Sequence, residues 1–180
     1  MYRLFTAVDL PVAVAQELAA LGFGLPGARW VPAEQLHLTL RFIGEVDGGL
    51  FRDLGQALAE VKAAPFSMGL LGFGCFPPRG PARILWAGVE PPAPVAALYR
   101  KVENVLVRRG LVAPEKRKFA PHVTVARLDR VPRQRLGNFL AGNNLYRSPT
   151  FTVGEFHLYS SQLTPKGPIH RLEASYELAG

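Results

Sequence analysis

Two short segments of the chain carry the same pair of chemically active residues. His37 and Thr39 are separated by one leucine, and His122 and Thr124 are separated by one valine. An imidazole whose ordinary pKa is about 6.5 can accept or donate a proton near neutral pH, and a hydroxyl can donate a hydrogen bond to an anionic oxygen. Two such pairs suit a reaction in which one group takes a proton while another gives one.

Both pairs lie in segments that alternate like half-buried strands. In such a strand His37 and Thr39 share one face while the leucines between and beside them share the other, and the same alternation places His122 with Thr124. A lone His-x-Thr in an amphipathic strand is weak evidence, because a solvent-facing polar row often produces it. Two copies in matching contexts are not expected of histidines scattered over a surface.

The elements around the two pairs form a repeated order. Hydrophobic periodicity predicts strands at 2–9, 36–43, 83–90 and 122–128 and near 150–160 and 169–178, an apolar stretch at 66–76, and helices within 11–22, 50–61, 95–110 and around 136–140. The order strand, helix, strand, helix, strand appears twice, which suggests an internal duplication. The alternation alone suits parallel βαβ units equally well, and it does not decide whether the halves exchange strands.

Composition indicates one compact unit. The chain has 180 residues, of which 48% are hydrophobic and 19% charged, so disordered and fibrous classes are implausible. The net charge of +7 favours anionic partners such as RNA, nucleotides or phosphate esters, although solubility alone could also explain it. No apolar run approaches the roughly 18 residues of a membrane span, so we expect no association with a membrane. The single cysteine, Cys75, cannot form an internal disulfide, and we expect the protein to be cytoplasmic.

The sequence offers no familiar metal or nucleotide motif. It contains no cysteine pair, no His-Glu-x-x-His and no glycine-rich loop with a P-loop lysine. We therefore expect the protein to need no metal and no other cofactor.

The two His-x-Thr (HxTx) segments and their surroundings resemble the 2H phosphoesterase superfamily, and specifically the RNA 2',3'-cyclic phosphodiesterases once named 2'-5' RNA ligases. The resemblance covers essentially the whole chain, and one departure is His170, where the family more often has an aromatic residue. The matching segments are Arg3–Phe5, Asp9–Pro11, Arg29–Val31, His37–Glu45, Phe73–Pro77, Arg83–Trp86, Phe119–Arg127, Ser161, Leu163, Pro165 and Gly167–Pro168.

This resemblance implies an α+β fold. Two pseudo-symmetric lobes, each an antiparallel sheet with outer helices, would flank a central active-site groove. We expect residues 1–180 to form one bilobal domain.

The resemblance also implies the reaction, hydrolysis of RNA 2',3'-cyclic phosphate ends to 2'-phosphates. His37 would be the proton donor and His122 the proton acceptor, while Thr39, Thr124 and Arg127 would bind phosphate. Strand alternation alone puts Arg127 on the opposite face from His122, so a bend must redirect it. The expected partners are RNAs with cyclic phosphate ends, such as tRNA fragments, or small cyclic nucleotides, bound by a monomer.

Two alternative functions stay open. One is ATP-independent 2'-5' ligation of RNA, the reverse direction of similar chemistry. The other is a non-catalytic RNA-binding protein, although binding alone needs charge and stacking and not paired proton-transfer groups.

Several other residues have two possible interpretations. Arg41 shares the strand alternation of His37 and could touch phosphate, or it could be an ordinary exposed arginine. The aromatic residues Phe5, Trp30 and Phe42 could stack a base but are more often core. The remaining histidines, His157 and His170, are interpreted as structural or surface residues, and the basic run Lys116–Lys118 as either an RNA-steering or a solvated loop.

Overall fold

The computed structural model describes residues 1–180. Its strands are β1 (Tyr2–Asp9), β2 (Ala28–Trp30), β3 (His37–Val46), β4 (Phe66–Phe76), β5 (Ile84–Glu90), β6 (His122–Leu128), β7 (Phe151–Val153), β8 (Glu155–Thr164) and β9 (Gly167–Glu177). The helices are α1 (Val12–Ala20), the 3-10 turn η1 (Ala33–Gln35), α2 (Gly48–Leu58), α3 (Pro92–Arg108) and α4 (Arg133–Asn143). None of the helices is long and apolar enough to span a membrane.

The residue before each α-helix favours the start of a helix. Proline occupies the residue before α1, α3 and α4, where its fixed φ and missing N–H are tolerated. Helix α2 instead begins after Asp47, whose side chain accepts a hydrogen bond of 2.8 Å from the backbone N–H of Leu50. Each α-helix buries at least one leucine, namely Leu18 in α1, Leu54 and Leu58 in α2, Leu98 and Leu106 in α3, and Leu136 in α4.

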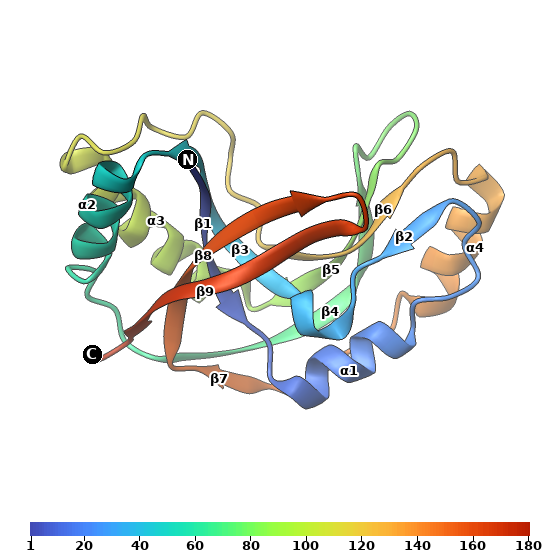
Figure 1. The fold of residues 1–180 in the computed structure, drawn as a ribbon. Helices are drawn as coiled ribbons and strands as arrows, with labels where there is room; N and C mark the ends of the chain where they lie inside the picture. The colour runs from blue at the N-terminus through green and yellow to red at the C-terminus, as the bar shows by residue number, and fades with distance from the viewer.

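The strands form one curled antiparallel sheet in the order β7-β4-β5-β6-β3-β1-β8-β9, with β2 added beside β6. Every pairing is antiparallel. The sheet divides into a first lobe of β3, β1, β8 and β9 and a second lobe of β6, β5, β4, β7 and β2 (Figure 1). The α+β fold with two antiparallel lobes, expected from the resemblance, is therefore confirmed.

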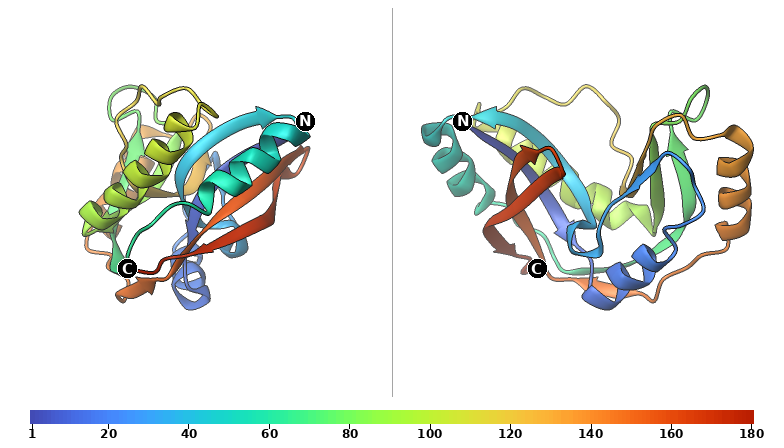
Figure 2. Two further views of the ribbon diagram at one scale, coloured as in Figure 1. Left: turned by 90° about the vertical axis from the view of Figure 1, so that its left-hand side faces the viewer. Right: turned by 45° about the vertical axis from the view of Figure 1, so that its right-hand side comes forward.

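Each lobe contains strands from both halves of the chain. Strand β4 comes from the first half and pairs with β5 of the second lobe, whereas β8 comes from the second half and pairs with β1 of the first lobe. Helix α3 likewise packs against β3 of the first lobe. Helices α2 and α3 lie together outside the first lobe, and α4 lies outside the second (Figure 2). The repeated halves have thus exchanged elements.

The two lobes join along a very short stretch of sheet. Strands β3 and β6 pair only at Leu38 and Val123, both fully buried. A continuous core of 34 buried residues surrounds this pair and extends into both lobes. The two strands diverge on either side of it, as the right-hand view of Figure 2 shows.

A β-bulge follows each histidine at the same distance. Thr39 pairs with Ala7 and Arg41 with Thr6, which leaves Leu40 unpaired in β3. In β6 the corresponding extra residue is Val125, three positions after its histidine. A bulge inserts one residue and so reverses which side chains face each side of the sheet.

The bulge in β6 resolves the position of Arg127. Val125 and Ala126 are consecutive buried residues, and Arg127 after them is exposed. Its side chain is thereby returned to the face that carries His122 and Thr124. The strand alternation used in the sequence analysis fails here because it assumes an uninterrupted ladder.

The bulge in β3 has the opposite effect on Arg41. This residue is 8% exposed and lies on the core side, where its guanidinium contacts Glu103 (Nε to Oε2, 3.1 Å), Glu115 (Nη1 to Oε2, 3.0 Å) and the carbonyl of Ala113 (Nη2 to O, 2.7 Å). Both interpretations of Arg41 from the sequence, a phosphate contact and an ordinary exposed arginine, are therefore wrong. Arg41 links β3 to α3 and to the loop after it.

We predict that Arg41→Ala lowers the free energy of unfolding by about 3 kcal/mol, because it leaves the largely buried Glu103 carboxylate without its partner. Urea denaturation would measure the change. The matched control is Arg100→Ala on the exposed side of α3, which should change stability by less than about 0.5 kcal/mol. Equal stability of the two variants would contradict a structural role for the Arg41 ion pairs.

Candidate active site

The short contact between β3 and β6 brings both His-x-Thr pairs to one face of the sheet. Because Leu38 and Val123 pair in an antiparallel ladder, His37 on one strand lies diagonally across from His122 on the other. The two rings are close enough that the charge of His122 contributes to lowering the pKa of His37. The structure thus brings together the two histidines predicted from the sequence.

Each imidazole is held by the backbone two residues before it. His37 Nδ1 lies 2.7 Å from the carbonyl oxygen of Gln35, and His122 Nδ1 lies 2.6 Å from that of Ala120. A carbonyl oxygen only accepts hydrogen bonds, so Nδ1 is the donor in both rings. In the neutral state the lone pair is then on Nε2 of each ring, where it can accept a hydrogen bond or a proton.

The two threonines flank this chemistry on the same strands. Thr39 Oγ1 lies 3.0 Å from His37 Nε2, and both Thr39 and Thr124 are partly exposed. Arg127 follows Thr124 on the same face after the bulge. The five residues predicted from the sequence therefore occupy one face of two adjoining strands.

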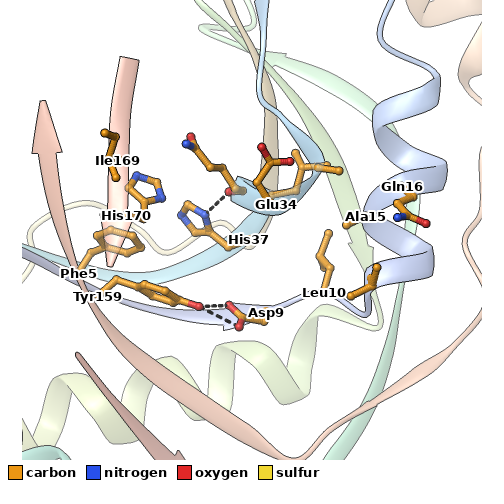
Figure 3. A pocket seen from close by; sticks show the side chains of 14 residues that line it. Phe5, Asp9, Leu10, Ala15, Gln16, Glu34, His37, Tyr159, Ile169 and His170 are labelled. Atoms are coloured by element: carbon orange, nitrogen blue, oxygen red, sulfur yellow. Dashed lines mark hydrogen bonds between the residues drawn. The ribbon is translucent and has the colours of Figure 1, made fainter. Parts of the chain in front are cut away.

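Aromatic side chains surround His37 on the side away from β6. The Phe5 ring stacks on the imidazole with centroids 5.0 Å apart, and Tyr159 stacks behind Phe5 at 5.4 Å. These residues line a cavity of about 680 Å³ between β1, β8, β9, η1 and α1 (Figure 3). His37 is thus one wall of a pocket as well as part of the paired site.

Asp9 anchors the floor of this pocket. It is the register partner of His37, and the Tyr159 hydroxyl donates to its carboxylate at 2.7 and 2.8 Å (Figure 3). His157, which is buried, approaches the same carboxylate with 3.3 Å between Nε2 and Oδ2, and its Nδ1 lies 2.9 Å from Ser175 Oγ. The structural interpretation of His157 is consistent with this position.

His170 lies in the pocket itself. Its ring meets His37 edge-on with centroids 5.3 Å apart and also packs against Phe5 at 5.0 Å. Burial, with a smaller effect from His37, lowers the pKa of His170 to about 4, so the ring is neutral at neutral pH. The interpretation of His170 as structural or surface missed this position. The only sequence signal for it was the departure from an aromatic residue after Gly167–Pro168.

The pKa of His37 is set by opposing influences. Burial, the largest effect, lowers it below 6.5, while the hydrogen bond to Gln35 and the charge of Asp9 raise it. At neutral pH the ring is therefore mostly neutral but can still be protonated. Asp9 limits how far burial lowers the protonated fraction of His37.

A second aromatic group stands beside His122. Phe76 meets the imidazole edge-on at 5.1 Å, and Trp86, the register partner of Thr124, lies 6.4 Å from it. The indole covers Gly74 so closely that a Cβ there would overlap the ring. Gly74 thus allows Trp86 to lie flat as a wall of the site.

The basic run Lys116–Lys118 and Cys75 are not among the residues found beside the two imidazoles. Lys116–Lys118 lie in the loop before β6 and are exposed. Cys75 is a free thiol whose Sγ lies 4.0 Å from the carbonyl oxygen of Pro77. No three His, Cys, Asp or Glu side chains gather in a way that could hold a metal ion.

Comparison with protein families supports the paired arrangement. The sequence model described as LigT-like phosphoesterase matches twice, at residues 8–86 and 89–170. Each match contains one His-x-Thr pair. The family model therefore recognises the same internal repeat that the order of elements suggested. The chain belongs to the LigT-like phosphoesterase family.

Curated members of this family align along nearly the full length of the chain. The RNA 2',3'-cyclic phosphodiesterase of Thermotoga maritima is 34% identical over 94% of this chain and 92% of its own. The protein of the same name from Thermus thermophilus is 35% identical over 99% of this chain and 91% of its own.

Solved LigT-like structures share the fold. A Thermus thermophilus protein, TT0787, superposes with a TM-score of 0.77 at 29% identity, covering 98% of this chain and 97% of its own. LigT of E. coli, solved in complex with 3'-AMP, gives 0.78 at 25% identity over 99% of both chains. The bilobal arrangement therefore accommodates considerable sequence divergence.

We predict that Gly74→Ala displaces the Trp86 indole and alters the surroundings of His122, because the added methyl occupies the position of the ring. The NMR signals of the His122 imidazole should shift while those of His37 stay in place, and stability should fall by about 1–3 kcal/mol. The control is Gly137→Ala within α4, where nothing lies within 4 Å of the new Cβ. Unchanged His122 signals in Gly74→Ala would show that the indole does not form this wall.

Proposed function

We propose that the protein hydrolyses 2',3'-cyclic phosphates at RNA ends to 2'-phosphates. The observation that carries this proposal is the pair of imidazoles on one face of β3 and β6, each bonded through Nδ1 to the carbonyl two residues earlier, so that Nε2 is the atom of each ring that can transfer a proton. The curated LigT-like relatives named RNA 2',3'-cyclic phosphodiesterase support the same substrate. A protein that only bound RNA would have no need of this matched pair.

The proposed reaction is an in-line displacement at phosphorus. Nε2 of neutral His122 takes a proton from water as the water oxygen bonds to phosphorus on one side. The bond from phosphorus to the ribose 3' oxygen breaks on the opposite side, and Nε2–H of protonated His37 gives its proton to that oxygen. The product is a 2'-phosphate with a free 3' hydroxyl, and proton exchange with solvent restores both rings.

The other three residues predicted for the site stabilise charge in this scheme. Thr39 and Thr124 donate hydrogen bonds to the non-bridging phosphate oxygens, where negative charge is redistributed in the transition state. Arg127, on the same face as Thr124, adds a fixed positive charge. The scheme uses proton transfer by imidazoles and needs no metal or other cofactor.

The net charge of the protein bears on its range of substrates. The net charge of +7 favours polyanions, so RNA ends such as those of tRNA fragments fit the proposal. Action as a monomer in the cytoplasm, and as a single domain spanning residues 1–180, stays a prediction.

We predict that His37→Ala and His122→Ala each reduce turnover of a short RNA with a 2',3'-cyclic phosphate by about 10²- to 10⁴-fold, because each removes one proton transfer. Hydrolysis would be followed by chromatography in chelator and without ATP, conditions in which the intact protein should retain its rate. Thr124→Ser, which keeps the hydroxyl, serves as the matched conservative variant and should stay close to the intact protein.

Circular dichroism would verify that both alanine variants fold. Full activity in either one would eliminate the two-histidine mechanism. Loss of the intact protein's activity in chelator, restored by zinc or magnesium, would eliminate the metal-free scheme.

We predict that Asp9→Asn moves the alkaline limb of kcat/KM to lower pH. As the proton donor, His37 must be protonated, so the rate falls as pH rises through the His37 pKa, which already lies below 6.5. Asp9 raises that pKa, and its removal lowers it further. Asparagine still accepts the Tyr159 hydrogen bond, so the geometry is retained.

The matched control is Asp53→Asn, which removes one carboxylate from an exposed position in α2. Its pH profile should not shift. An alkaline limb in Asp9→Asn that coincides with that of the intact protein would argue against His37 as the donor.

A further inference from the structure

Two arginines stand directly opposite one another beside the active site. In the β2–β6 ladder, Arg29 is the register partner of Arg127. Directly opposed residues point to the same face with Cβ atoms about 4.5–5.5 Å apart. Because the bulge at Val125 places Arg127 on the face of His122 and Thr124, Arg29 is on that face as well.

Both arginines of this pair are exposed and face one another with no carboxylate between them. Arg29 and Arg127 are both exposed, and the side chain of neither makes an ion pair or hydrogen bond within the protein. Even Asp129, just beyond the end of β6, forms no ion pair with either. A carboxylate lies within 4.0 Å of Arg41, Arg109, Arg147 and Arg171. Many other arginines also lack such a partner, so what distinguishes Arg29 and Arg127 is their direct opposition in the ladder.

Such a pair is unfavourable for the empty protein. Like charges directly opposite in a sheet destabilise it, and nothing nearby offsets the repulsion. An anion placed between two guanidinium groups would remove that repulsion and could accept bidentate hydrogen bonds from both.

The pair also lies in line with the reaction site. Strand β2 pairs with β6 beyond Val123, the residue at which β3 meets β6, and the backbone N–H of Val31 bonds to the carbonyl of Val125 at 2.9 Å. Arg127 is three residues beyond Thr124, which corresponds to at most about 10 Å along an extended strand. The cavity beside His37 lies on the other lobe.

We propose that Arg29 and Arg127 form a second anion subsite, which holds the phosphodiester joining the terminal nucleotide to the rest of the RNA. This inference rests on the proposed function and adds a substrate class to it. Arg127 lies between the reactive cyclic phosphate and this phosphodiester and can contact both. Arg29 contacts the phosphodiester alone. The substrate is accordingly an oligonucleotide, and a cyclic mononucleotide lacks half of the contacts.

The test compares Arg29→Ala with the intact protein on two substrates. One is adenosine 2',3'-cyclic phosphate, and the other is an adenosine dinucleotide ending in the same cyclic phosphate. The ratio of kcat/KM for dinucleotide to mononucleotide should fall by about 10-fold or more, the loss expected from a charge-assisted hydrogen-bonded contact. Affinity for the dinucleotide should also depend less on salt. The slope of log affinity against log salt concentration should become shallower by about 0.7, the contribution of one phosphate contact in a single strand.

Arg100→Ala removes the same charge from the exposed face of α3 and should leave the ratio unchanged. Arg29→Lys keeps the charge without the bidentate geometry and should give an intermediate ratio. Equal losses on both substrates, or no loss on either, would overturn the subsite.

Binding separates failure of this inference from failure of the proposed function. If the intact protein hydrolyses neither substrate, the proposed function fails. Fluorescence anisotropy with a labelled adenosine dinucleotide 3'-phosphate then decides the subsite. Weaker binding by Arg29→Ala than by Arg100→Ala would support it, and equal binding would overturn it.

Discussion

The pairing of Leu38 with Val123 is the contact on which the rest of the site depends. It is the one point where β3 and β6 meet, and each residue is preceded in its strand by a histidine. Because both side chains are fully buried, the register of the two strands is fixed by the core and not by the polar face. A slip of one residue in either strand would turn the imidazole of that strand toward the core, so packing and chemistry are constrained together.

The surroundings of the two rings are similar in kind but not in strength. Both imidazoles use Nδ1 to bond a carbonyl two residues earlier, yet His37 is enclosed by Phe5, Tyr159 and His170, whereas His122 meets Phe76 and Trp86 at a more open position. Burial lowers the pKa of His37, and Asp9 opposes that effect. Such unequal environments would suit the different roles proposed for the two rings, proton donor and proton acceptor.

Much of this could be predicted from the sequence. Alternation located β1 and β6 to the residue, and the duplicated motif located both histidines, because these signals are local. The exchange of β4 and β8 could not be predicted, since periodicity does not report which strands pair. Simple alternation placed Arg41 and Arg127 on the wrong faces of their strands. The bulges at Leu40 and Val125 cause this error, and no residue in the sequence marks them. His170 reaches His37 only through tertiary packing of the β8–β9 hairpin.

The exchange of strands between the halves makes the protein comparable to a dimer whose two subunits have been fused. Each half of the chain supplies one imidazole and sends a strand into the opposite lobe, β4 in one direction and β8 in the other. A half-length ancestor would have carried a single histidine and an incomplete sheet, so it could have assembled this site only as an interlocked pair. The two halves of a single chain can differ from one another as two identical subunits cannot: five residues after its histidine, β6 carries Arg127 where β3 carries Phe42.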